Sequence, residues 1–274
     1  MRELEAALSE DYLFEKGRVL GSMNTRPIEG SVDAHAMFIE SNLGNPGLYP
    51  GTRKLEAKVV SILSELLHGR NLYGQTMSGG TEGNITACWI ARNITGKKEV
   101  LFCENAHFSM EKACDVLRMK PIEVCLNENY EMDLEDARAK LSEDTAIVVA
   151  SAGSTELGLI DPIEELSELC REKVFLHVDA SFGGFVIPFL KELGYPTKPF
   201  DFEVESVTSL VLDGHKMGMG TIPCSVFLLR REEDIHSIAV KSPYLTSIYQ
   251  TSLLGTRCSA GVASLYFSMR DTVG

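Results

Sequence analysis

The sequence lacks the features of a secreted, membrane-spanning or nucleic-acid-binding protein. Its seven cysteines are widely separated, with no Cys-x-x-Cys pair, which argues against a disulfide framework and against a structural zinc site. No apolar run approaches the roughly 20 residues of a membrane span, and residues 1–20 contain no apolar signal-peptide core. Basic residues are outnumbered: 26 Lys and Arg against 39 Asp and Glu give a net charge of -13, the wrong sign for binding a phosphate backbone. We therefore expect a cytoplasmic protein with reduced thiols and with neither nucleic acid nor membrane as a partner.

Short apolar runs alternate with amphipathic stretches, which is typical of an α/β domain with a largely parallel sheet. Strands are expected at 100–103, 122–125, 146–150, 174–178, 209–212 and 226–229, and a further strand-like run precedes Ser78. Helices are expected at 53–67, after the turn at 78–81, at 134–141 and at 162–170. Asp161 is expected to cap the last of these helices.

Polar residues follow five of the expected strands. They are Ser78, His107, the stretch Ser154–Glu156, Asp179 and the stretch Asp213–Lys216. Open α/β sheets bind their ligands in the crevice beyond the carboxyl ends of the strands. The five strand ends therefore predict one shared site.

Three of these groups suggest a specific chemistry. Ser78-Gly79-Gly80-Thr81 joins a strand to a helix, where glycines, free N–H groups and the helix dipole can hold an anion. This turn matches neither the P-loop nor the G-x-G-x-x-G pattern, which disfavours a nucleotide. Lys216 directly follows an apolar strand, where an unpaired ammonium is costly and a Schiff-base lysine is common. Asp179 ends another strand and could hold a protonated pyridine nitrogen.

Ordinary structural roles remain open for the same residues. Glycine pairs are common at helix starts, Lys216 could be a surface lysine, and Asp179 could cap a turn. His107 could stack on a flat ring or be a structural histidine. A zinc or iron site is a further alternative, with the candidate ligands His107, His177, Asp179 and His215. Alternation puts His177 and Asp179 on one face of their strand, but a metal site leaves Lys216 and the glycine turn without a role.

Two motifs together resemble those of the group II pyridoxal 5′-phosphate (PLP)-dependent amino-acid decarboxylases. They are HVDASFGG at 177–184 and, after a strand, DGHK at 213–216. The archaeal L-tyrosine/L-aspartate decarboxylases are the most similar group. Five further stretches carry this resemblance: SNLGNPGL at 41–48, MSGGTEGN at 77–84, AHFS at 106–109, STELG at 154–158 and LGTR at 254–257. The likeness runs from about Leu20 to the last residue.

The resemblance implies a fold-type I (aspartate-aminotransferase-like) large domain and a homodimer with active sites at the subunit interface. It assigns residues 1–50 to an N-terminal segment and 51–274 to the PLP-binding large domain. The family then continues into a small C-terminal domain, which we expect to be missing from this chain. Gly214 stands where the family usually has proline, and Asn24–Pro27 stands where a substrate-facing turn is expected.

The same resemblance implies roles for individual residues. Lys216 would carry PLP as a Schiff base, His107 would stack on the ring and Asp179 would pair with the pyridine nitrogen. Tyr244, which matches a tyrosine on a mobile loop of the family, would protonate the α-carbon of the substrate. The remaining cofactor contacts would come from Ser78, Gly79, Gly80, Thr81, Thr155, Ser181, His215 and, across the dimer, Gly255 and Thr256. No metal is expected.

The implied activity is decarboxylation of an L-amino acid through an external aldimine and a carbanion or quinonoid intermediate. L-Tyrosine would give tyramine for methanofuran synthesis, and L-aspartate would give β-alanine for coenzyme A; L-glutamate also stays open. Two alternatives remain. One is a PLP-dependent carbon–carbon lyase resembling sphingosine-1-phosphate lyase, and the other is a catalytically silent fragment that binds PLP or dimerises.

Overall fold

The computed structural model describes residues 1–19, 23–170 and 174–273. Leu20 and Gly274, the ends of the family likeness, lie outside this part of the chain. The helices are α1 (Arg2–Glu10), α2 (Glu29–Met37), α3 (Pro50–Leu66), α4 (Gly80–Thr95), α5 (Ser109–Leu117), α6 (Leu134–Lys140), α7 (Ile163–Cys170), α8 (Ile187–Glu192) and α9 (Ser259–Val273). The strands are β1 (Tyr73–Met77), β2 (Glu99–Cys103), β3 (Lys120–Val124), β4 (Thr145–Ser151), β5 (Phe175–Asp179), β6 (Val207–Leu212), β7 (Ser225–Leu229), β8 (Val240–Lys241) and β9 (Tyr249–Gln250).

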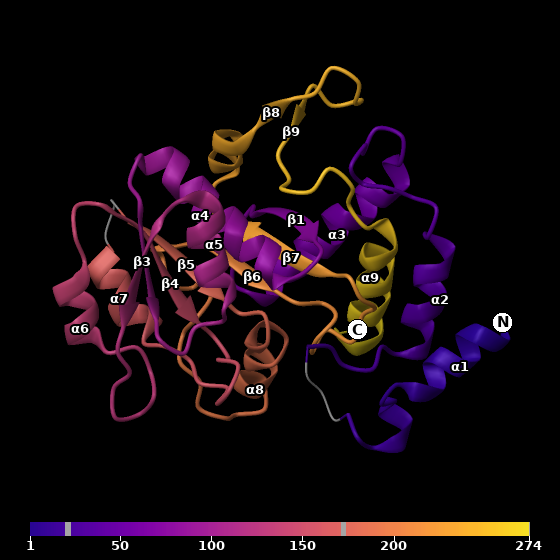
Figure 1. The fold of residues 1–274 in the computed structure, drawn as a ribbon, viewed down its shortest axis with the longest axis horizontal. Coiled ribbons are helices and arrows are strands. Elements are labelled where there is room, and N and C mark those ends of the chain that lie inside the picture. Colours follow the sequence, from indigo (N-terminus) through magenta and orange to yellow (C-terminus); the bar gives the residue numbers. More distant parts are fainter. Residues whose placement is uncertain (20–22, 171–173, 274) are drawn as a thin grey trace.

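A seven-stranded sheet forms the centre of the molecule, in the order β1-β7-β6-β5-β4-β2-β3 (Figure 1). All the pairs from β3 to β6 are parallel, whereas β7 is antiparallel to both of its neighbours. The expected α/β fold with a mainly parallel sheet is confirmed. Because two antiparallel pairs separate β1 from β6, these two strands run in the same direction.

The central strands of the sheet are buried on both faces, which explains why strands such as β4, β6 and β7 read as apolar runs, whereas the edge strands β1 and β3 contain polar residues. In β4, Ile147 and Val149 belong to a core layer shared with α4 and α5. Val148 and Ala150 face the other way, into a layer shared with α3, α7 and α9. Because side chains alternate between the two faces of a strand, Ile147 and Val149 contribute to one layer and Val148 and Ala150 to the other.

The expected helix at 162–170 is present, but its predicted cap is wrong. The Asp161 carboxylate accepts hydrogen bonds from the N–H groups of Met132 (2.9 Å) and Ser151 (2.7 Å). It therefore joins the end of β4 to the loop before α6. The position next to the helix was the only clue in the sequence, and it did not reveal these two distant donors.

Two segments lie outside the sheet layers. Helix α2 packs along α9 (Figure 1), where Gly30 lies against the ring of Phe267. The hairpin β8–β9, which lies between β7 and α9 in the sequence, projects from the rest of the molecule (Figure 1). Among the described residues, none of the helices combines the length and the apolar character needed to cross a bilayer.

Candidate functional site

Five strand ends that carry polar residues lie at one edge of the sheet. Strands β1, β2, β4, β5 and β6 all run in the same direction, so their carboxyl ends meet at that edge. The one strand that runs the other way, β7, carries none of the predicted site residues. The sheet topology therefore agrees with the predicted shared site.

The glycine turn between β1 and α4 is packed tightly against two other strand ends. A Cβ atom on Gly80 would lie 2.2 Å from Ser181 Oγ and 3.3 Å from Asp213 Oδ1. A Cβ atom on Gly79 would lie 3.8 Å from the ring of His215. A side chain at position 80 would thus have no room, which accounts for glycine there.

Some hydrogen-bond donors of this turn bond to the protein itself, and others are available to an anion. The backbone N–H and the hydroxyl of Ser78 both donate to Glu82 Oε2, at 2.8 and 2.9 Å. The N–H groups of Gly80 and Thr81 lie in the first turn of α4, where intrahelical acceptors are missing. These N–H groups, together with the positive end of the helix, form an anion site.

Asp179 ends β5 and is held as a carboxylate. Its Oδ1 accepts from the N–H (3.0 Å) and the hydroxyl (2.6 Å) of Ser181, and its Oδ2 accepts from Asn84 Nδ2 at 2.7 Å. Burial acts to raise the pKa of Asp179, but the hydrogen bonds from Ser181 and Asn84 outweigh it and lower this pKa below its usual value. A permanent negative charge at this position suits a protonated ring nitrogen.

Lys216 lies in the turn after β6 and forms an ion pair there. Its Nζ atom is 3.0 Å from Asp213 Oδ2, and His215 Nε2 is 3.6 Å from the same oxygen. His215 Nδ1 donates to the carbonyl of Cys224 at 2.5 Å, which fixes the orientation of its ring. Burial raises the pKa of Asp213, and Asp213 Oδ1 has no hydrogen-bond partner within the described residues.

His107 follows β2 and lies within the electrostatic reach of Asp179, Lys216 and Asp213. Its Nδ1 is 2.9 Å from the hydroxyl of Ser109. Burial lowers the pKa of the half-buried His107 ring, so the neutral imidazole is favoured.

Four predicted residues lie away from this cluster or are not tied to it. Thr155 is exposed on the turn after β4. Tyr244 is 82% exposed, in the loop between β8 and β9 (Figure 1). Gly255 and Thr256 are exposed, and the carbonyl of Gly255 lies against Gly44. The roles of these four residues stay predictions.

Sequence reasoning missed several residues that organise the site. Asn84 belongs to the quoted glycine stretch and lies one helical turn after Gly80, a spacing that could have singled it out as a neighbour of Asp179. Glu82 belongs to the same stretch and accepts from Ser78. Asp213 is part of the predicted motif at 213–216 but was given no role of its own. Thr25 lies in the segment Asn24–Pro27, where the resemblance predicted a substrate-facing turn, and its N–H and hydroxyl donate to the carbonyls of His215 (3.0 Å) and Lys216. The N-terminal segment therefore contacts the backbone of the lysine turn.

The alternative metal site is not formed. Both ring nitrogens of His177 are in hydrogen bonds, to Ser209 Oγ (2.8 Å) and Asn84 Oδ1 (2.9 Å). Both oxygens of Asp179 are also hydrogen-bonded. His177, whose two ring nitrogens are both occupied, therefore offers no free lone pair to an ion shared with Asp179.

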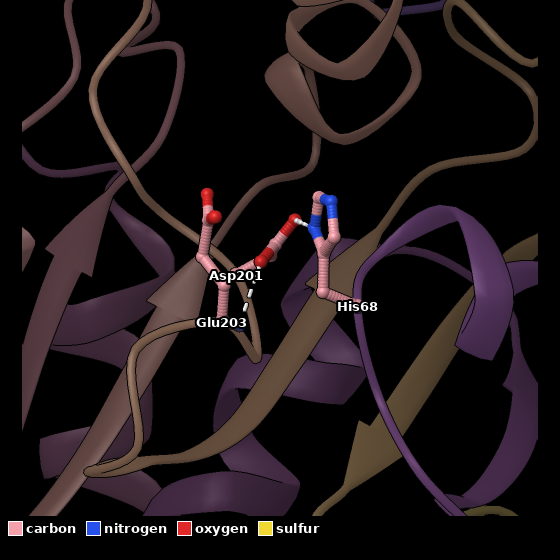
Figure 2. A group of neighbouring side chains, drawn as sticks. All are labelled: His68, Asp201 and Glu203. Atoms are coloured by element: carbon pink, nitrogen blue, oxygen red, sulfur yellow. Dashed lines mark hydrogen bonds and ion pairs between the residues drawn. The ribbon is translucent and has the colours of Figure 1, made fainter.

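Another group with metal-ligand chemistry is His68, Asp201 and Glu203 (Figure 2). His68 Nδ1 is 2.9 Å from Asp201 Oδ2, and Asp201 Oδ1 accepts from the N–H of Glu203. Glu203 is paired with Lys191 at 3.1 Å. Because these groups satisfy one another, they form a structural cluster.

A cavity of about 850 Å³ lies elsewhere, between α3, β1 and the chain that follows β8. Its walls include Glu56 and Arg257, which form a buried ion pair with each other. None of the predicted site residues lines this cavity. The residues Ser78–Thr81, His107, Asp179 and Asp213–Lys216, called the strand-end cluster below, therefore lie apart from this cavity.

The strand-end cluster fits PLP. The glycine turn offers N–H groups to a phosphate, Asp179 offers a negative charge to a pyridinium, and Lys216 offers an amine. Asp213 pairs with this amine through Oδ2, and its other oxygen, Oδ1, is buried without a hydrogen-bond partner within the described residues.

Comparisons with known proteins agree with this assignment. The model of the pyridoxal-dependent decarboxylase conserved domain matches residues 39–271. A probable L-aspartate decarboxylase of Pyrococcus furiosus is 45% identical over 97% of this chain and 73% of that protein. A probable L-tyrosine/L-aspartate decarboxylase of Methanothermobacter thermautotrophicus is 44% identical over 94% of this chain and 72% of that protein.

Solved structures show the same fold. Sphingosine-1-phosphate lyase of Burkholderia pseudomallei matches with a TM-score of 0.89 at 26% identity, covering 98% of this chain and 67% of that one. L-Methionine decarboxylase of Streptomyces matches with a TM-score of 0.85 at 20% identity, covering 98% and 75%. The predicted fold, cofactor and family are thus confirmed. The chain belongs to the pyridoxal-dependent decarboxylases, and it is an amino-acid decarboxylase with PLP as its cofactor.

Proposed function

We propose that this enzyme removes the α-carboxylate of L-aspartate to give β-alanine. L-Tyrosine, which would give tyramine, is the second candidate. The relatives support both: several of them are named L-aspartate decarboxylases, and others are named L-tyrosine/L-aspartate decarboxylases. The match to the decarboxylase family over most of the chain favours this reaction over carbon–carbon cleavage.

The strand-end cluster supplies a role for each part of the cofactor. We assign the phosphate to the turn Ser78–Thr81 with His215, and the pyridinium nitrogen to Asp179, which Ser181 orients. His107 would cover the ring, and Thr155 would lie at its edge. When bound, PLP supplies an electron sink for the pair of electrons left by the departing CO2.

The remaining steps concern protons. Lys216 would bind the cofactor covalently and release it to the amino group of the substrate. Asp213 Oδ2, 3.0 Å from Lys216 Nζ, would hold the freed amine in place. The hydroxyl of Tyr244 would then deliver a proton to the α-carbon of the substrate.

Tyr244, Gly255 and Thr256 are exposed and apart from the cluster of their own chain, which supports a role in the site of a second subunit. We propose a homodimer in which each chain completes the site of the other. Mixing the inactive variants Lys216→Ala and Tyr244→Phe should then restore about a quarter of the activity, because about half of all dimers pair one chain of each variant and each such dimer has one intact site of two. A mixture that forms mixed dimers but stays inactive would place Tyr244 in the site of its own chain.

The substrate is tested directly with the full chain and PLP. L-Aspartate, L-tyrosine and L-glutamate are supplied separately, and CO2 and the amine product are measured. We expect CO2 and β-alanine in equal amounts from L-aspartate. Tyramine alone would make tyrosine the substrate, and no CO2 from any of the three would favour the catalytically silent alternative. Cleavage of sphingosine 1-phosphate would favour the lyase.

Tyr244→Phe should lower kcat by about 10²–10⁴-fold with little change in KM, the usual effect of losing a general acid. Tyr249→Phe is the matched control, since Tyr249 is an exposed tyrosine of the same hairpin. Steady-state kinetics of both variants checks this. Equal kcat values for the two variants would remove the proton-donor role from Tyr244.

A further inference from the structure

The two groups assigned to the cofactor ring, Asp179 and His107, follow different strands but are linked through one buried residue. This neighbour is Asn84, in the second turn of α4, which is fully buried. Asn84 Nδ2 donates to Asp179 Oδ2 at 2.7 Å and to Ser109 Oγ at 2.9 Å. Ser109 Oγ in turn contacts His107 Nδ1 at 2.9 Å.

The orientation of the Asn84 amide follows from the charge of Asp179. An ionised carboxylate only accepts hydrogen bonds, so the atom of Asn84 that faces it must be the NH2 group. This group has two hydrogens, and both are used, on Asp179 and on Ser109. The amide oxygen then faces His177 Nε2 at 2.9 Å, so that nitrogen must donate.

The hydrogens of the two histidines follow in the same way. His177 is neutral, because burial lowers its pKa to about 4. With its hydrogen on Nε2, its Nδ1 accepts from Ser209 Oγ. On the other branch the hydroxyl of Ser109 accepts from Asn84 and therefore donates to His107 Nδ1. This leaves Nε2–H as the tautomer of the neutral His107 ring.

The hydrogen bonds of this network also show how many acceptor positions of the Asp179 carboxylate remain free. A carboxylate has about four lone-pair positions. Ser181 fills two of them through its N–H and hydroxyl, and Asn84 fills a third. One position remains for an N–H donor from a ligand.

We propose that Asn84 is a positioning residue that fixes two groups together. It holds the carboxylate of Asp179 toward the nitrogen of the cofactor ring and, through Ser109, the ring of His107 toward the face of the cofactor ring. The inference rests on the proposed cofactor contacts of Asp179 and His107. Asn84 does not touch the cofactor in this arrangement. It sets the charge and direction of one group and the tautomer of the other.

The decisive variants are Asn84→Leu and Asn84→Asp. Leucine has a similar size and removes every hydrogen bond of the amide. Aspartate keeps an acceptor for His177 but places a second carboxylate against Asp179, so it breaks only the branch toward the cofactor. Thr86→Val is the matched control: Thr86 is a buried residue of the same helix whose hydroxyl donates only to the Glu82 carbonyl of that helix.

The readouts are PLP affinity, measured by titrating the cofactor-free protein, and the pH at which the visible absorption of bound PLP changes. Both Asn84 variants should bind PLP about tenfold more weakly, the effect of one lost hydrogen bond to a charged group. The pH midpoint should move in both variants, because the ionisation of Asp179 is altered next to the cofactor. Thr86→Val should leave both quantities at their wild-type values.

Ser109→Ala separates the two branches. It should change the visible circular dichroism of bound PLP, which reports on the ring packed against His107, and leave the pH midpoint set by Asp179 in place. This variant and Asn84→Asp carry the test if Asn84→Leu does not fold.

Wild-type affinity and an unchanged pH midpoint in Asn84→Asp would overturn the inference. A shift of the same size in Thr86→Val would do so too, because it would show that any change in α4 disturbs the site. The proposed cofactor contacts are tested separately, with the Lys216 and Asp179 variants. If those variants lose PLP binding while Asn84→Asp keeps it, the cofactor contacts stand and only the role of Asn84 is wrong.

Discussion

Lys216→Ala should abolish the visible absorption of lysine-bound PLP and lower amine formation on the order of 10³-fold, because the covalent attachment and a proton-handling amine are lost together. The ion pair with Asp213 disappears as well, leaving a buried carboxylate without its cation. The measurements are the absorption spectrum of the reconstituted protein and the rate of CO2 release.

Lys216→Arg separates the charge from the chemistry. Arginine keeps a cation beside Asp213 but cannot form the Schiff base at neutral pH. We expect this variant to recover folding stability and to remain without the visible band. A visible band that persists in Lys216→Ala would remove this lysine as the attachment point and, with it, the proposed arrangement of the cofactor.

Asp179→Asn should weaken PLP binding roughly 10- to 100-fold, the loss expected when a charge-assisted hydrogen bond is removed. The physical reason lies in the charge. Three donors from Ser181 and Asn84 hold Asp179 as a carboxylate, and a neutral amide cannot balance a pyridinium. Turnover should fall further than affinity, because an unprotonated ring is a poorer electron sink.

Asp161→Asn is the control for loss of a buried carboxylate. Asp161 is also buried and also accepts backbone N–H groups, but its donors, Met132 and Ser151, are not among the residues assigned to the cofactor. It should lower the free energy of unfolding and leave PLP affinity unchanged. If both variants weakened PLP binding equally, the effect of Asp179 would reflect stability and not a contact with the cofactor.

The central strands of the sheet could be predicted because they are buried on both faces, unlike the edge strand β3. The expected run at 146–150 is β4, extended by one residue at each end, and the run at 209–212 begins two residues late relative to β6. Polar residues at the strand ends then predicted the site, since parallel strands bring their carboxyl ends to one edge. The position of β7 was not predictable, because its apolar run is as uniform as those of the parallel strands.

The connections within the site were harder to predict. Asn84 is one polar residue in a helix of mixed composition, and its partners Asp179 and Ser109 are distant in sequence. Hydrogen bonds of this kind depend on the packing of α4 against the sheet, which no local pattern encodes. The roles proposed for the exposed residues Tyr244 and Thr256 depend on a second chain, which no local pattern encodes either.

The pairing of β1 also determines the order in which the site can be assembled. This strand ends in the phosphate-binding turn, yet its partner in the sheet is β7, near the other end of the sequence. During synthesis on the ribosome, β1 therefore cannot form its sheet pairing until β7 has emerged. Contacts this distant in sequence form slowly, so competence to bind the cofactor should be among the last properties gained in refolding.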